Sequence, residues 1–87
     1  MYVQNIKNDK GNSIPNQFII FDDNGNEFFQ SYDSIIVKIS DGKIYLDERT
    51  WNYSNTTAKY RRIFLKEGID LTRAKIKSGE YILTNLN

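Results

Sequence analysis

The 87-residue sequence contains no cysteine and no histidine. Without cysteine the chain can form neither a disulfide framework nor a thiolate site, and without histidine it lacks the commonest proton-transfer group near neutral pH. A structural zinc site needs ligands of these two types, and no Gly-rich phosphate loop is present. These absences predict a protein that is not an enzyme and that holds no metal or cofactor.

Long apolar runs are also missing. No segment approaches the roughly 18 apolar residues of a membrane helix, and residues 1–17 lack the apolar centre of a signal peptide. We therefore expect a cytoplasmic protein that does not contact a membrane. The length suits one domain, and 39% hydrophobic residues are enough for one core. Residues 1–16 are polar and hold the only proline, so we predict an N-terminal arm or edge strand there, before a single domain over 17–87.

Two β-rich runs, 18–21 and 27–32, open this domain. The residues between them, "DDNGN", contain an Asn-Gly pair that favours a type I′ hairpin turn, and five residues can also hold a longer loop. The stretch resembles a calcium loop, but the sixth position counted from Asp22 is Glu27 where an EF-hand needs glycine. A turn between two antiparallel strands is therefore the better interpretation.

Two further strands are predicted over 35–40 and 43–47, joined by a turn at Asp41-Gly42. Their alternation of apolar and polar residues is typical of strands with one buried face. The side chains expected to face inward are Ile35, Val37, Ile39, Ile44 and Leu46. Those expected on the other face are Ile36, Lys38, Ser40, Lys43, Tyr45 and Asp47.

The hydrophobic period changes to that of a helix after Trp51. Ser54 is predicted to cap a helix that begins at Asn55 and that Gly68 ends. The side expected to face the core carries Thr56, Tyr60, Ile63, Phe64 and Glu67. Trp51 and Tyr53 are expected to pack at the corner beneath it.

Asp70 is predicted to cap a second, shorter helix over 71–77, which Ser78-Gly79 ends. Residues 80–87 can return to the sheet. The predicted fold is therefore α+β: an antiparallel four-stranded β-meander with one long and one short helix packed on a face, and possible room for a short C-terminal strand.

Four segments carry a resemblance to a known family: "FQSYDSIIVKI", "GKIYLDE", "WNYSNTTAKYRRIFL" and "GEYILTNLN". They are similar to a family of small domains of unknown function encoded by bacteriophages, plasmids and related mobile elements, and the similarity covers residues 28–87. The residues that match its pattern are Gln30, Ser31, Tyr32, Trp51, Tyr53, Ser54, Thr56, Thr57, Lys59, Tyr60, Arg61, Phe64 and Leu65. The resemblance implies a setting, a mobile element inside a bacterial cell, and no mechanism.

Charge is unevenly distributed, which suggests two binding surfaces. Residues 54–79 carry seven basic and two acidic side chains, and residues 15–48 carry seven acidic and two basic ones. The candidate basic face comprises Lys59, Arg61, Arg62, Lys66, Arg73 and Lys77, together with Lys75. The candidate acidic face comprises Asp22, Asp23, Glu27 and Glu48, with Tyr32 or Tyr45 as an aromatic anchor. Ordinary segregation of charge between turns and helices explains either pattern equally well.

Two functions remain open at this point. The first is a binding protein that inhibits a host protein machine, in the manner of an anti-CRISPR or another anti-defence inhibitor, with the acidic face in a basic groove of a host protein or protein–nucleic-acid complex. The alternative is a small accessory or regulatory protein that binds nucleic acid through the basic helix face, where charge would set the salt dependence.

Overall fold

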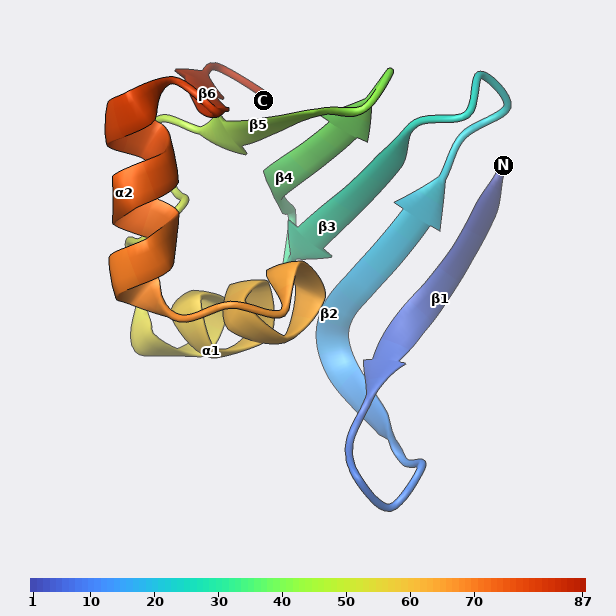
Figure 1. Cartoon of the computed structure of the whole chain (residues 1–87). Helices are drawn as coiled ribbons and strands as arrows, with labels where there is room; N and C mark the ends of the chain where they lie inside the picture. Colours follow the sequence, from blue (N-terminus) through green and yellow to red (C-terminus); the bar gives the residue numbers. More distant parts are fainter.

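The computed structural model describes residues 1–87, which fold into a six-stranded sheet and two helices (Figure 1). The elements are β1 (Tyr2–Lys7), β2 (Ser13–Phe21), β3 (Glu27–Ser31), β4 (Ser34–Ser40), β5 (Lys43–Asp47), α1 (Asn55–Leu65), α2 (Ile69–Ser78) and β6 (Tyr81–Thr84). The strands lie in chain order, all neighbours antiparallel except β5 and β6, which are parallel. The predicted α+β class is confirmed. Neither helix is long and apolar enough to cross a membrane.

The sheet has two more strands than the predicted four-stranded meander. Residues 1–16 form an edge strand, β1, and the first part of β2. The sequence signal for β1 is weak because Ile6 is its only buried residue. β6 is the short C-terminal strand, and it runs parallel to β5 because the two helices carry the chain back before it enters the sheet.

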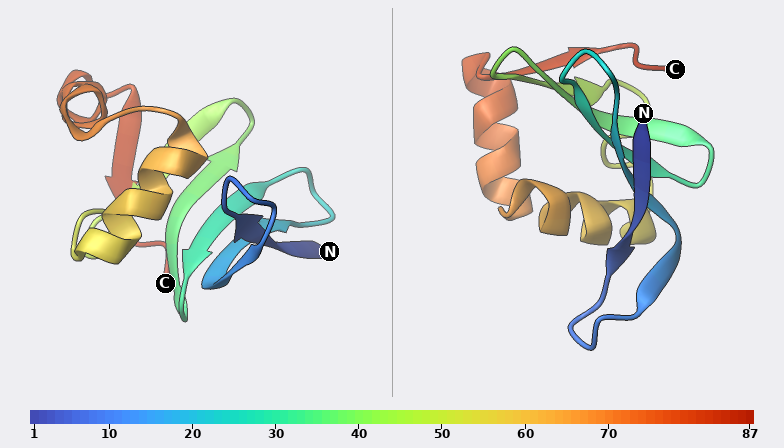
Figure 2. Two further views of the ribbon diagram at one scale, coloured as in Figure 1. Left: turned by 90° about the horizontal axis from the view of Figure 1, so that it is seen from below. Right: turned by 90° about the vertical axis from the view of Figure 1, so that its right-hand side faces the viewer.

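Both helices cover the same face of the sheet (Figure 2). Phe29 of β3 is fully buried in the core, and its ring stacks on that of Phe64 from α1 with centroids 5.7 Å apart. The buried hydrophobic residues are Ile6, Phe29, Ile36, Val37, Leu46 and Tyr81. The core thus joins five of the six strands to α1.

A β-bulge in β4 changes which isoleucine is buried. Phe29 pairs with Val37 but the next residue, Gln30, pairs with Ile35, so Ile36 has no partner in β3. A bulge of this kind turns two consecutive side chains toward one face. Ile36 and Val37 are accordingly both fully buried. The prediction that Ile36 faces away from the core is wrong, because strict alternation fails at an inserted residue.

The face of the sheet away from the helices carries one continuous cross-strand row. Successive strand pairs place six residues directly opposite one another: Val3, Ile20, Phe28, Lys38, Tyr45 and Ile82. Lys38 lies over the ring of Phe28, with its Nζ 5.9 Å from the centroid. Tyr45 and Lys38 therefore lie on the opposite side of the molecule from the helices.

Asp47 was expected to point outward and is instead buried. Its Oδ1 accepts a hydrogen bond from the N–H of Leu86, and its Oδ2 accepts from the N–H and the hydroxyl of Thr50. Burial alone would raise the pKa of Asp47, but these hydrogen bonds outweigh it and lower the pKa. The carboxylate thus fixes both the loop after β5 and the C-terminal segment. No local sequence pattern indicates that the C-terminal segment returns to Asp47.

Helix α1 begins where predicted but is rotated about its axis. Its buried residues are Thr57 and Arg61, whereas Thr56 and Ile63 are exposed, Ile63 at 48%. The side of α1 that faces the core therefore carries positions 57, 61, 64 and 65, which have helical spacing. One of these residues, Arg61, is a cation. Tyr53 is also exposed, whereas Trp51 packs against the core as expected.

The predicted N-cap of α1 is present, and we expect Ser54→Ala to lower the free energy of unfolding by about 1 kcal/mol. Ser54 Oγ accepts a hydrogen bond from the N–H of Thr57 at 3.1 Å, and alanine would leave that donor without an acceptor. Urea denaturation followed by circular dichroism measures the change. Ser13→Ala, at an exposed strand residue, is the control. Equal midpoints for the two variants would contradict a stabilising cap.

The connection between the helices differs from the prediction. Lys66 adopts the left-handed conformation that ends α1, with φ 60°, and Gly68 is the N-cap of α2 with an extended φ of −84°. α2 begins at Ile69, so Asp70 lies in its first turn and caps nothing. The two helices have similar lengths, 11 and 10 residues. Gly79, with φ 86°, ends α2 as expected.

The two hairpin turns have different geometries. Asp41 and Gly42 both have positive φ, 52° and 76°, as a two-residue type I′ turn requires. Between β2 and β3 only Gly25 has positive φ, so the longer loop forms there. Asp22 Oδ1 organises it by accepting from the N–H groups of Asn24 and Asn26.

Candidate anion-binding site

A pocket of about 310 Å³ lies between the first turns of α1, the loop before it and the start of α2. It is lined by Asn52, Asn55, Ala58, Lys59, Arg61, Arg62 and Ile69. The helical spacing of three and four residues places Asn55, Lys59 and Arg62 along one side of α1. The lining contains three cations and two amides and no carboxylate, a composition that suits an anion.

Arg61 is the least exposed of these cations, with 2% of its surface accessible. Its Nη1 donates to the carbonyl of Trp51 at 2.6 Å and to Asn52 Oδ1 at 3.1 Å, and the guanidinium lies 5.3 Å from the Trp51 ring centroid. Its Nε is buried and has no hydrogen-bond partner, and the side chain forms no ion pair. A buried charge without a counter-ion is energetically costly.

The surroundings of Arg61 make this cost larger. Burial lowers the pKa of Arg61, the positive charges of Arg62 and Arg73 lower it further, and Glu67 acts in the opposite direction. Guanidinium groups stay protonated at every physiological pH, so the shift reflects first the burial of the charge and then the neighbouring positive charges. A bound anion would offset this cost.

The cationic surface continues from the pocket along α2. Ile69 lines the pocket, and Arg73 and Lys77 follow at intervals of four residues, so the three side chains lie on one side of the helix. The exposed cations of the two helices and their connection are Lys59, Arg62, Lys66, Arg73 and Lys77. None of them forms an ion pair. Of the predicted basic face, five members therefore share one free surface and Arg61 lies beneath it.

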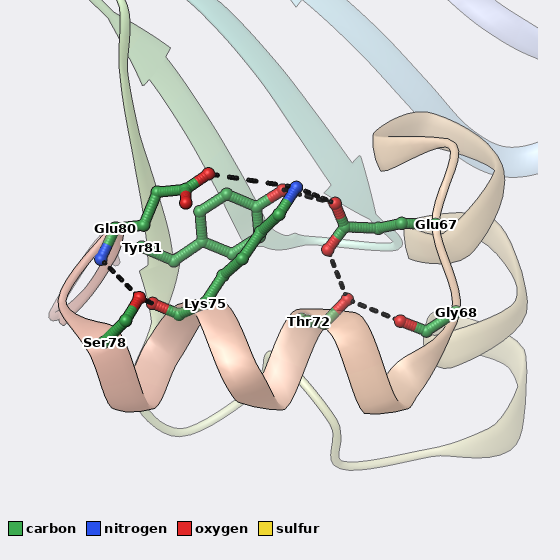
Figure 3. Close-up of polar contacts among 7 residues, drawn as sticks. All are labelled: Glu67, Gly68, Thr72, Lys75, Ser78, Glu80 and Tyr81. Carbon is green, nitrogen blue, oxygen red and sulfur yellow. Dashed lines mark hydrogen bonds and ion pairs between the residues drawn. The ribbon is translucent and has the colours of Figure 1, made fainter.

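Glu67, the carboxylate between the two helices, is engaged in a network of its own (Figure 3). Its Oε1 accepts from the hydroxyl of Tyr81 at 2.6 Å and from Lys75 Nζ at 2.8 Å, and its Oε2 accepts from the hydroxyl of Thr72 at 2.7 Å. Burial would raise the pKa of Glu67, but these three donors together lower it. The network ties the interhelical connection to α2 and β6, and it removes Lys75 from the free basic surface.

The structure divides the predicted acidic face between two ends of the sheet. Asp22, Asp23 and Glu27 lie at the β2–β3 turn, next to the β4–β5 turn that contains Asp41. Tyr32 follows β3 and is exposed at the other end of the sheet, where the exposed Glu48 follows β5. The five residues of β3 separate the two groups by about 17 Å at roughly 3.3 Å per residue.

Asn52, Asn55 and the inward position of Arg61 were not predicted as parts of this pocket. A signal was present in the sequence. Arg61 and Arg62 are consecutive, and consecutive helical side chains point about 100° apart, so one arginine of such a pair lies closer to the core. The expected core side, with Thr56, does not identify which one; in the structure it is Arg61, four residues from the buried Thr57 and three from Phe64.

Comparison with known proteins gives one match. A family model described as a family of unknown function (DUF8033) matches residues 1–82. The match includes the β1–β2 hairpin as well as the pocket and both helices. Neither the search of curated proteins nor the search of solved structures found a match.

Proposed function

We propose that this chain, which belongs to the DUF8033 family, is a non-enzymatic protein that binds nucleic acid, holding its phosphate groups on the surface formed by α1 and α2. The observation that carries the proposal is Arg61, a buried cation without a counter-ion at the base of a cationic pocket. A phosphate group would supply the missing anion, and its oxygens would accept from the guanidinium.

The extent of the basic surface favours a polyanion over a single small anion. The free cations extend from Lys59 and Arg62 on α1 to Arg73 and Lys77 on α2. Successive phosphates of a nucleic acid can occupy such a surface, and each neutralised phosphate releases counter-ions into solution. Binding should therefore weaken steeply as the salt concentration rises.

Neutralising two of these cations, in Lys59→Gln with Arg62→Gln, is expected to reduce both the affinity and its salt dependence. Each lost phosphate contact lowers the slope of log K against log[salt] by about 0.7–0.9, so the slope should fall by up to about 1.4–1.8. Fluorescence anisotropy with a labelled 12-nucleotide oligothymidylate, titrated at several salt concentrations around 0.1 M, measures both quantities.

The matched control is Lys38→Gln with Lys43→Gln, which also removes two positive charges, from the sheet face away from the helices. It should change the salt slope little. Equal losses in the two double variants would mean that net charge alone governs binding. Absence of wild-type binding at about 0.1 M salt would overturn the proposed function.

A second candidate is an inhibitor that binds a host protein machine in the bacterial cytoplasm, as an anti-CRISPR or another anti-defence protein does. It is favoured by the resemblance to mobile-element domains and by the acidic end of the sheet, where Asp22, Asp23, Glu27 and Asp41 lie close together. Such an end could enter a basic groove. Capture of one defined bacterial protein that survives nuclease treatment and requires these carboxylates would favour this candidate.

A further inference from the structure

A second pocket, of about 350 Å³, adjoins the first along α1. It lies between α1 and the β1–β2 hairpin and is lined by Lys7, Asn8, Asp9, Ile14, Lys59, Tyr60 and Ile63. Lys59 lines both pockets, so the two lie on either side of this one side chain. A ligand that reaches from one pocket to the other would pass Lys59.

The two pockets differ in chemistry. The first has three cations and two amides beside Ala58 and Ile69. The second adds an aromatic ring, that of Tyr60, and the larger apolar side chains of Ile14 and Ile63 to its charged and polar lining. Ile63 is 48% exposed, so it offers apolar contact to a ligand. Asp9 also lines the second pocket, where its carboxylate would repel a phosphate and could accept from a base N–H group.

We infer that the paired pockets bind single-stranded nucleic acid, with a phosphate in the cationic pocket and the neighbouring base against Tyr60 and Ile63 in the second pocket. This inference rests on the proposed function and specifies its ligand. A duplex keeps its bases stacked inside and has no free base face for Tyr60, whereas a single strand can turn a base out onto an aromatic side chain. Lys59, whose Nζ lies 5.4 Å from the Tyr60 ring centroid, links the phosphate site and the base site.

The test compares three labelled probes by fluorescence anisotropy at about 0.1 M salt: a 12-nucleotide oligothymidylate, the same length of abasic phosphodiester, and a 12-base-pair duplex. Stacking of one base on an aromatic side chain contributes about 1–3 kcal/mol, which corresponds to about 5-fold to more than 100-fold in affinity. The abasic strand should therefore bind at least about 5-fold more weakly than the oligothymidylate, and the duplex should also bind more weakly.

Tyr60→Leu then assigns the effect to one side chain. It should weaken binding of the oligothymidylate by a similar factor and leave binding of the abasic strand unchanged, while Tyr60→Phe, which keeps the ring, should behave as the wild type. Tyr60 is half-buried and packs on the core, so Ile63→Ser, at an exposed position, repeats the test without disturbing the fold. It should lower the affinity for the oligothymidylate alone.

The outcomes separate this inference from the proposed function. If no probe binds, the proposed function fails. If all three bind equally and respond to Lys59→Gln with Arg62→Gln, the phosphate surface stands and the base site is wrong. Equal losses for the oligothymidylate and the abasic strand in Ile63→Ser would likewise overturn the base site.

Discussion

Phe29→Ala is expected to lower the free energy of unfolding by about 3–5 kcal/mol, the largest stability effect that we predict for a single substitution. Phe29 is completely buried, stacks on Phe64, and lies where α1 contacts β3. Alanine would leave a cavity that neither a strand held by its two neighbours nor a helix held by its cap can close. Native domains have a total free energy of unfolding of only about 5–15 kcal/mol, so the variant should be largely unfolded, or only marginally stable, at 37 °C.

Urea denaturation monitored by circular dichroism measures this loss. The matched control is Phe28→Ala, which removes the adjacent phenylalanine from the same strand on the face that the helices leave uncovered. That residue is only partly buried, and its replacement should cost about 1 kcal/mol. Similar losses for the two variants would show that the two faces of the sheet contribute equally and that the core is not where we place it.

Arg61→Met is expected to abolish most of the phosphate binding and to leave stability nearly unchanged. Hydrogen bonds to charged groups contribute about 1.5–3 kcal/mol, so loss of the guanidinium should weaken oligonucleotide binding about 10-fold to more than 100-fold. Methionine fills the space of the arginine stem and removes a buried charge that has no counter-ion. That gain should offset most of the cost of leaving the Trp51 carbonyl without its donor, within about 1 kcal/mol.

Two measurements check this pair of expectations. Anisotropy with the oligothymidylate gives the affinity, and urea denaturation in phosphate and in chloride buffers of equal ionic strength gives the stability. The wild type should be more stable in phosphate, because an anion that binds only the native state stabilises it, and Arg61→Met should lose this difference. Arg61→Lys keeps the charge and should retain part of it. A loss of 3 kcal/mol or more in Arg61→Met, with binding intact, would make Arg61 a structural residue alone.

Local sequence patterns predicted the parts of this fold that depend on short-range interactions. The cap at Ser54, the tight turn at Asp41-Gly42 and the end of α2 at Gly79 each depend on a few neighbouring residues. The position of Gly68 was misread because Lys66 took the left-handed conformation two residues earlier, which costs a side-chain-bearing residue more than glycine. Their positions in the chain alone do not show which of the two residues, Lys66 or Gly68, ends α1.

The errors in assigning faces have a different origin. The bulge that buries Ile36 is a property of the β3–β4 pair, and the burial of Asp47 requires a segment nearly forty residues later in the chain. Neither is encoded in the hydrophobicity of the residue itself. Arg61 shows the same limit for the candidate site, since a hydrophobic pattern assigns every arginine to the surface, whereas its long apolar stem can pack in the core.

The parallel pairing of β6 with β5 has a consequence for the order in which the molecule assembles. β1 to β5 are joined by short connections, so each pair of consecutive strands can form as a local hairpin. β6 can pair with β5 only after both helices have formed, because they lie between the two strands in the chain. Contacts between distant residues close late, because the chain must first lose the entropy of the intervening loop. The hydroxyl of Thr72 can reach Glu67 as soon as α2 forms, whereas Tyr81 reaches Glu67 only when β6 arrives, in the final step. The pocket is lined only by residues of α1, the loop before it and the first residue of α2, so the binding surface can form before β6 pairs with β5.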